Sequence, residues 1–172
     1  MHSSAGTYLT KADLSRAGGG RNTTWVAPAL QRSDQILRGR IGFIDIEEGL
    51  SVHYSNAVDL HDLHTEAEAP PGITISVFLE GDVEAWIGPM RIPVPGRDAD
   101  GCPGAPVATI YAMTQPEKFL RQARRGCRLR KVSIGISAGW LEQNSGFAAS
   151  DADPVRHFMR EHLARRVWTP GA

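Results

Sequence analysis

Two alternating runs on either side of a short acidic turn constrain the fold of this chain more than any other feature. Apolar residues occupy every second position from Ile73 to Leu79 and again from Val83 to Ile87, and the segment Glu80–Asp82 separates the two runs. Side chains on a strand point to opposite faces with a period of two, so each run can bury one face. The glycine at the centre of the turn permits the positive φ of a tight reversal. The pattern predicts a β-hairpin over residues 72–88, as in an antiparallel barrel or sandwich.

The register of this hairpin has two solutions. If Leu79 pairs with Val83, the aliphatic side chains share one face, and Trp86 lies on the face of Ser76 and Phe78. A two-residue turn shifts the pairing by one residue and moves Trp86 to the aliphatic face. The first register is preferred because it separates apolar from polar side chains, and the second stays open.

The composition is that of a neutral globular chain. It has 172 residues, of which 41% are hydrophobic, enough for one domain with a buried core. Basic and acidic residues number 19 each, so no net charge draws the chain toward nucleic acid or a membrane. The sequence shows no bilayer-spanning run and no signal peptide, so we expect a cytoplasmic protein without a membrane partner. Cys102 and Cys127 lack the spacing of a zinc site or a redox pair, and we expect them to stay reduced.

Further alternating segments predict a mainly β fold. These segments are residues 41–46, 50–55, 90–94, 107–113 and 132–136. Residues 1–36 are polar and contain three consecutive glycines, so we expect a flexible N-terminal arm with a short ordered piece near Trp25.

Capping signals predict three helices in the C-terminal half of the chain. Thr114 and Pro116 favour a helix that runs to about Arg125 and ends at Gly126. Ser137 can cap a short helix that carries Trp140. A last helix is expected to open at Asp153 and Pro154, and its apolar positions form one stripe: Val155, Phe158, Met159, Leu163 and Val167.

The order of these elements supports a comparison with a known family. The stretch Leu37–Leu141 resembles the N-terminal half of AraC-type transcriptional regulators, in particular the pyochelin-responsive subgroup. The resemblance is carried by LRGRIGFIDIEEGLSVHYSN, PPGITISVFLEGDVEAWIG and TQPEKFLRQARRGCRLRKVSIGISAGWLEQ. It implies a cupin-like β-barrel that senses an effector or mediates dimerisation.

The resemblance also implies a domain organisation. We expect a flexible arm over residues 1–36, a cupin-like antiparallel β-barrel or sandwich over 37–141, and a loop with an amphipathic helix over 142–172. In AraC-type regulators a helical half with two helix-turn-helix units follows the barrel. Because this chain ends at Ala172, we expect that DNA-binding half to be absent, and DNA contact to require it.

The metal ligands of cupin enzymes are missing from the matching positions. Cupin enzymes carry two histidines and a glutamate ahead of the hairpin glycine, but the segment Glu68–Thr74 contains no such set. Ala99 stands where a later histidine should follow Pro95 and Gly96. We therefore expect no metal and no cofactor. The pair His61 and His64 lacks a third ligand and is interpreted as exposed loop histidines.

Catalytic motifs are equally absent from the sequence. No nucleophile elbow appears, and the adjacent Glu47 and Glu48 are expected at a solvated turn. The glycines at 18–20 lack the lysine and the flanking strand of a phosphate-binding loop. We therefore expect no catalytic residues. The alternative is a small stand-alone metal-free cupin enzyme, either an isomerase or a lyase.

Two groups of side chains are candidates for binding. The basic cluster could contact an anion, although a solvated surface is the favoured interpretation; it comprises Arg121, Arg124, Arg125, Arg128, Arg130 and Lys131. Tyr54, Trp86 and Tyr111 are the candidate effector-binding residues, because such rings offer a flat apolar face together with a hydrogen bond. Filling of the core by these rings is the competing interpretation.

The sequence therefore predicts the effector-sensing and dimerisation domain of an AraC-type transcription regulator. The expected partners are a small-molecule effector, with an iron–siderophore complex as one option implied by the resemblance, and a second copy of the chain. The expected dimer surface lies on the last helix, at Phe158, Met159 and Leu163.

Overall fold

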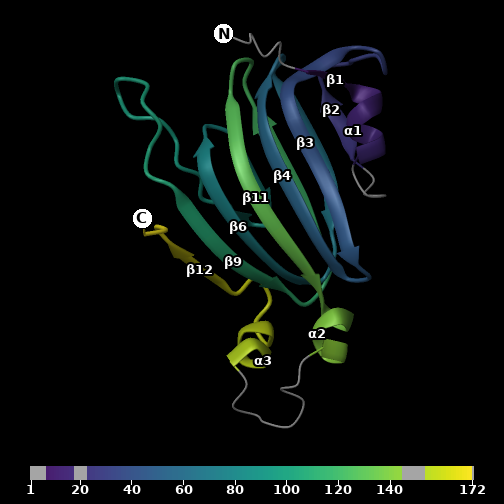
Figure 1. The fold of residues 1–172 in the computed structure, drawn as a ribbon, viewed down its shortest axis with the longest axis vertical. Helices are drawn as coiled ribbons and strands as arrows, with labels where there is room; N and C mark the ends of the chain where they lie inside the picture. Colours follow the sequence, from purple (N-terminus) through teal and green to yellow (C-terminus); the bar gives the residue numbers. More distant parts are fainter. Residues whose placement is uncertain (1–6, 18–22, 145–153, 172) are drawn as a thin grey trace.

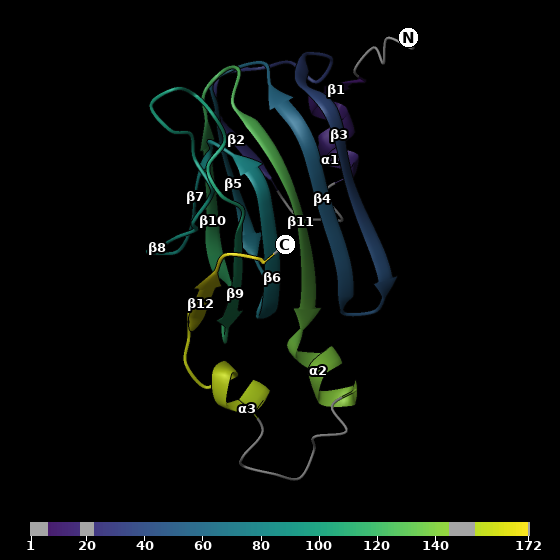
Figure 2. The same ribbon diagram turned by 60° about the vertical axis from the view of Figure 1, so that its left-hand side comes forward.

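Two antiparallel sheets pack face to face as a β-sandwich in the computed structural model, which describes residues 7–17, 23–144 and 154–171 (Figures 1 and 2). In spatial order, the large sheet contains β1 (Tyr8–Thr10), β3 (Gln35–Glu47), β4 (Leu50–Asp59), β11 (Arg128–Ser137), β6 (Gly72–Gly81), β9 (Val107–Met113) and β12 (Arg165–Trp168). The small sheet contains β2 (Thr24–Ala27), β5 (Leu63–Ala69), β10 (Glu117–Ala123), β7 (Glu84–Ile87) and β8 (Met90–Arg91). The helices are α1 (Lys11–Ala17), α2 (Ala138–Asn144) and α3 (Pro154–Met159).

The mainly β prediction is confirmed, and of its two forms the structure adopts the sandwich. The strand pairing of the described residues leaves two separate sheets and no closed barrel. The turned view in Figure 2 separates the two layers and places α2 and α3 together at one end of the large sheet. No helix among the described residues has the length and apolar character needed to cross a membrane.

The predicted hairpin over residues 72–88 does not form. Strand β6 pairs with β11 and β9 in the large sheet, whereas β7 pairs with β10 and β8 in the small sheet. The chain therefore crosses from one sheet to the other between the two runs. Asp82 holds this crossing against β11, because its Oδ1 accepts a hydrogen bond from the Arg128 amide at 2.7 Å. The alternation was a correct sign of two strands, but alternation does not identify a strand's partner.

The aliphatic face of β6 also points away from the space between the sheets. Ser76 and Phe78 are buried on the inner face, while Leu79 on the outer face is 40% exposed. In β7, Ala85 and Ile87 are buried between the sheets, so Trp86 lies on the outer face of the small sheet. Both registers considered for Trp86 fail, because its strand pairs with β10 and β8 instead of β6.

The N-terminal segment, expected as a flexible arm, contributes elements to both sheets. Strand β1 extends the large sheet beside β3, and β2 extends the small sheet beside β5. Leu14 from α1 and Trp25 from β2 pack against a buried cluster around Ile36 and Leu37. This burial of apolar side chains supplies a physical reason for order. The ordered piece expected near Trp25 is confirmed as β2, and the three glycines lie outside the described residues.

The helix predicted from Thr114 to Arg125 is instead a central strand of the small sheet. Strand β10 lies between β5 and β7; it pairs with β5 along its whole length and with β7 over Phe119–Gln122. Phe119, Arg121 and Ala123 all face the space between the sheets, which is the period of two expected of a strand and not of a helix. Tertiary pairing overrides the local capping signal here. Gly126 has φ of 89° in the turn that leads from β10 to β11.

The C-terminal stripe is divided among three elements and does not form one helical face. Helix α3 begins at Pro154 as predicted but ends at Met159, and the preceding Asp153 lies outside the described residues. Phe158 and Met159 pack on the outer side of the large sheet, against a cluster that includes Ile73. Leu163 packs instead against the core between the sheets and has φ of 61°, so it cannot continue the helix. Beyond it, β12 pairs with β9.

The short helix after Ser137 is confirmed. The Ser137 hydroxyl accepts a hydrogen bond from the Trp140 amide at 3.1 Å, which is the expected N-cap contact at the start of α2. Helix α2 follows directly from the end of β11, so the position of this strand fixes where α2 starts.

Candidate functional site

The space between the sheets contains two adjoining cavities. The large cavity has a volume of about 510 Å³, and the small cavity has a volume of about 180 Å³. They share the lining residues Thr23, Phe43, His53, Phe119 and Lys131. The large cavity extends toward the end of the sandwich where α2 begins, because Ser137 and the turn at Gly49 also line it.

Inward-facing side chains of four strands form the sheet wall of the large cavity. Phe43 and His53 lie opposite each other on β3 and β4, and their rings stack with centroids 4.1 Å apart and planes at 3°. His53 lies opposite Ser133 on β11, and Ser133 lies opposite Ser76 on β6. Opposed residues in neighbouring strands lie on one face of the sheet, so strand pairing sets this row of side chains.

The wall of the large cavity includes a buried pair of hydroxyls at Ser133, which lines the cavity. The hydroxyls of Ser76 and Ser133 are 2.8 Å apart and buried, and they join β6 to β11. The ammonium group of Lys131 lies 5.6 Å from the centre of the Phe78 ring, within the range of a cation–π contact. Tyr111 and Phe119 add aromatic surface from β9 and β10, on opposite sheets.

Exposed carboxylates line the large cavity where it meets solvent. They belong to Asp45, Glu47, Glu48 and Glu68. The cavity thus combines an acidic rim, an aromatic and aliphatic interior and the one positive charge of Lys131. Such a combination suits a small molecule with an apolar or aromatic body and a few polar groups.

Of the three predicted effector-binding aromatics, only Tyr111 lines either of these two cavities. Tyr111 is buried and lines the large cavity. Tyr54 is 37% exposed on the outer face of the large sheet, where its ring lies over Gly42. Trp86 lies on the outer face of the small sheet, opposite Leu120 of β10. The three rings therefore do not converge.

Sequence reasoning missed Phe43, His53 and Phe119, and it placed Lys131 on a solvated surface. Each of these side chains lies at an alternate strand position, but alternation alone does not show which face is inward. Once β3, β4 and β11 are placed beside one another, the cross-strand pairs identify the lining residues. The sequence thus showed that these residues lie on strands, but it did not show which strands pair with one another.

The basic cluster is divided by the fold. Arg121 and Lys131 line the small cavity, whereas Arg124, Arg125 and Arg130 are exposed as the favoured interpretation expected. Arg128 forms an ion pair with Glu80, with Nε and Oε2 3.1 Å apart.

The two histidines of the HxxH pair have separate surroundings. His61 Nε2 lies 3.0 Å from the Gln35 carbonyl oxygen. His64 is part of β5 and half-buried, so it is not the exposed loop residue that was expected. No cluster of three or more histidine, cysteine, aspartate or glutamate side chains suited to a metal ion occurs in the described parts of the chain.

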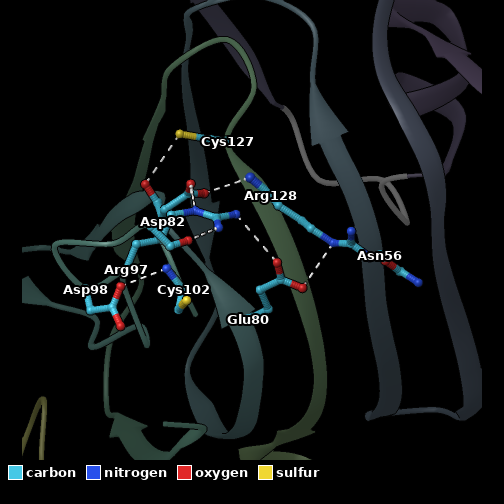
Figure 3. Close-up of polar contacts among 9 residues, drawn as sticks. Asn56, Glu80, Asp82, Arg97, Asp98, Cys102, Cys127 and Arg128 are labelled. Atoms are coloured by element: carbon cyan, nitrogen blue, oxygen red, sulfur yellow. Dashed lines mark hydrogen bonds and ion pairs between the residues drawn. The ribbon is translucent and has the colours of Figure 1, made fainter. Parts of the chain in front are cut away.

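A polar network holds the opposite end of the sandwich (Figure 3). Asp82 Oδ2 accepts a hydrogen bond from Arg97 Nε at 2.9 Å, and Arg97 also forms an ion pair with Glu80. The Cys127 thiol donates to the Asp82 carbonyl oxygen at 3.4 Å. Burial raises the pKa of Cys127 above its ordinary value, so the thiol stays protonated at neutral pH. This network joins the crossing between the sheets to the loop after Pro95.

Comparison with known proteins gives one match. No curated protein and no solved structure matches the chain. Residues 38–172 match the model of the family described as regulatory protein PchR N-terminal domain. This family is regulatory, in agreement with an effector-sensing domain and with the absence of catalytic motifs from the sequence. Because the match covers well over half of its length, the chain belongs to the family of regulatory protein PchR N-terminal domains.

Proposed function

We propose that this chain is the effector-sensing domain of an AraC-type transcription regulator and that its effector binds in the large cavity. The observation that carries the proposal is the cavity of about 510 Å³ inside the sandwich. Ligand sites in proteins commonly occupy roughly 300–1,000 Å³ and combine an apolar lining with a few placed polar groups. Membership of a regulatory family supports a sensing role for such a cavity.

The lining favours an effector with a flat, largely apolar body. Phe119 and the stacked rings of Phe43 and His53 belong to opposite sheets and line the same cavity. An anionic or oxygen-rich group of the effector would find a positive charge at Lys131. Since the chain resembles pyochelin-responsive regulators, the iron complex of pyochelin is the first effector to test.

Coupling to the rest of a regulator would run through α2. Ser137 lines the large cavity and also caps α2, so a ligand that displaces the end of β11 shifts the start of this helix. In this proposal DNA is bound by a helical half with two helix-turn-helix units. The equal numbers of acidic and basic residues support the view that this chain itself does not attract DNA.

Two tyrosines provide a matched test. Tyr111 lines the large cavity and Tyr54 does not, so Tyr111→Ala should weaken binding of the iron complex at least tenfold while Tyr54→Ala leaves it unchanged. Calorimetric titration of each purified variant measures the affinities, and circular dichroism confirms that each variant is folded. Equal affinity in wild type and both variants would place the effector outside the cavity.

Lys131→Met removes the positive charge and keeps much of the side-chain length. The proposal expects this variant to bind the iron complex more weakly and to reduce the dependence of its affinity on salt concentration. An unchanged affinity would remove Lys131 from the site.

Self-association is the second part of the proposed function. The predicted helical surface is partly covered, because Leu163 packs against the core and Phe158 and Met159 pack against the large sheet. The outer aliphatic surface of the large sheet offers an alternative, with exposed side chains from β3, β4, β6 and β11: Ile44, Tyr54, Leu79, Val132 and Ile134. Exposed apolar surface of this kind commonly marks an interface, and we propose that two copies of the chain pair through it.

Light scattering at micromolar concentration tests this surface. Ile134→Glu should convert a dimer to a monomer, because both copies would bury the charge at a twofold interface. Val26→Glu is the matched control, since Val26 is exposed to a similar degree on the small sheet. A monomeric wild type, or a dimer that survives Ile134→Glu, would refute the interface.

A further inference from the structure

The small cavity continues the large cavity through a junction that both sheets enclose. Of the residues that line both cavities, Phe43, His53 and Lys131 belong to the large sheet, Phe119 belongs to the small sheet, and Thr23 precedes β2. A ligand in the large cavity that contacts Phe119 or the stacked rings of Phe43 and His53 therefore lies beside the small cavity.

The surface that the small cavity offers to a ligand is predominantly apolar. Aliphatic side chains from both sheets contribute to it, among them Ile41, Ala57, Leu129, Leu63 and Ala85. An apolar group that enters this cavity exchanges contact with water for contact with hydrocarbon, and this exchange favours binding.

The polar side chains around the small cavity bind within the protein or are covered by it. Asp59 Oδ2 accepts a hydrogen bond from Arg121 Nη2 at 2.6 Å, and the Ser55 hydroxyl donates to the Leu129 carbonyl oxygen at 3.4 Å. Asp59 Oδ1 and Trp25 Nε1 expose almost no surface, so the protein itself covers them. A polar ligand group in this cavity would lose its hydrogen bonds to water and gain few in return, which is unfavourable.

The volume of the small cavity sets the size of an occupant. At about 180 Å³ it is slightly larger than an engineered apolar cavity of about 150 Å³ that holds benzene, so it has room for about six carbon atoms. Protein interiors contain few voids larger than a water molecule, and apolar voids stay dry. The walls of an empty apolar cavity lack dispersion contacts, which an apolar occupant restores.

We propose that the effector has two parts: a flat body in the large cavity and a hydrocarbon extension of about six carbon atoms in the small cavity. The inference deepens the proposed function and rests on it for the position of the body. The body meets the extension at the junction, beside Phe119 and Lys131. The extension is a hydrocarbon because a polar group at its end would be desolvated against aliphatic walls.

A series of 4-alkylphenols tests the extension, because its members share one aromatic body and differ only in the length of the alkyl chain. Ligand-detected NMR titration of the full chain with 4-methylphenol and 4-hexylphenol compares the two ends of the series. Each methylene group that moves from water into an apolar cavity strengthens binding about fourfold. The hexyl compound should therefore bind at least tenfold more tightly than the methyl compound.

Two substitutions fill the small cavity from opposite sheets. Ala57 on β4 and Ala85 on β7 line the small cavity and not the large one, and replacement of either by leucine adds three carbon atoms to the space. Ala57→Leu and Ala85→Leu should each reduce the preference for 4-hexylphenol at least fivefold and leave the affinity for 4-methylphenol unchanged.

Ala67→Leu is the matched control, because Ala67 lines the large cavity and not the small one. This variant should weaken binding of both phenols by the same factor and leave the preference for the hexyl chain unchanged. Circular dichroism confirms that each variant is folded, and if one of the two filling variants does not fold, the other decides.

A preference for 4-hexylphenol below tenfold in the wild type would overturn the proposal, as would no binding of either phenol. A preference that survives Ala57→Leu and Ala85→Leu would overturn it too, because the chain would then lie elsewhere. Failure of the proposed function has a different signature. Equal affinity of 4-methylphenol for the wild type and Ala67→Leu would place the body outside the large cavity, whatever the effect of chain length.

Discussion

Trp140 Nε1 donates a hydrogen bond to Glu47 Oε1 over 2.6 Å, and this contact joins α2 to the turn between β3 and β4. The Ser137 amide donates to the Gly49 carbonyl at 2.8 Å and reinforces the same connection. Glu47, Gly49 and Ser137 all line the large cavity. The rim of the cavity and the start of α2 therefore form one hydrogen-bonded unit.

Trp140→Phe should weaken the connection between α2 and the cavity rim, while the phenyl ring keeps most of the apolar contacts of the indole. The variant loses a hydrogen bond to a carboxylate, and we expect a cost of about 1 kcal/mol because the pair is exposed to solvent. Hydrogen exchange of the α2 amides should become faster, while exchange in β5 stays unchanged. Trp168→Phe on β12 is the control. Equal protection of α2 in wild type and Trp140→Phe would show that other contacts hold the helix.

The buried serine pair between β6 and β11 should behave as a coupled unit. Ser76→Ala or Ser133→Ala leaves one buried hydroxyl without its partner, and each should lower the free energy of unfolding by about 1–3 kcal/mol. The double variant should cost clearly less than the sum of the two, because both polar groups are then removed. Urea unfolding of the four proteins measures the coupling. Additive costs would contradict a direct interaction between the hydroxyls.

The contribution of Asp59 to the free energy of unfolding should fall as pH rises above the acidic range. Burial raises the pKa of Asp59 above its ordinary value, although Arg121 acts in the opposite direction. The folded protein therefore holds the Asp59 proton to a higher pH than the unfolded chain does. Its contribution to stability is fully present below the unfolded pKa and is lost as pH rises through the folded pKa.

Comparison with Asp59→Asn isolates this contribution, because the other titrating groups are common to both proteins. The free energy of unfolding of wild type minus that of Asp59→Asn should decrease as pH rises from about 4 toward neutrality. Denaturant unfolding at several pH values measures it. A difference that grows with pH would mean that attraction to Arg121 outweighs burial.

Gly72 should tolerate no side chain at the start of β6. It has φ of 141°, and an added Cβ would clash with the Ile136 carbonyl oxygen of the neighbouring strand. Gly72→Ala should cost about 3 kcal/mol or more, since strained backbone and steric conflict act together. Gly96→Ala is the control, because Gly96 also has positive φ, at 71°, but open space around its Cα. Gly96→Ala should cost about 1 kcal/mol. Equal costs for the two variants would show that the clash at Gly72 does not contribute.

Local chemistry in the sequence determined several of the strands and where one helix starts. The period-two alternation from Ile73 to Leu79 predicted a strand that the structure confirms within β6, and Ser137 predicted the cap of α2. Both signals depend only on neighbours along the chain. Tyr111 was recognised as a binding candidate because its residue type combines an apolar ring with a hydroxyl.

Tertiary structure alone decided which strands pair and which faces are inward. A strand shows the same alternation whichever neighbour it pairs with, so the sequence could not place β6 and β7 in different sheets. Pairing on both sides turned the predicted helix at Thr114 into β10, because a central position in the small sheet outweighs a local cap. The cavities follow from the same choice: Phe119 of the small sheet and Lys131 and Asp59 of the large sheet line one cavity only after the two sheets are assembled and stacked.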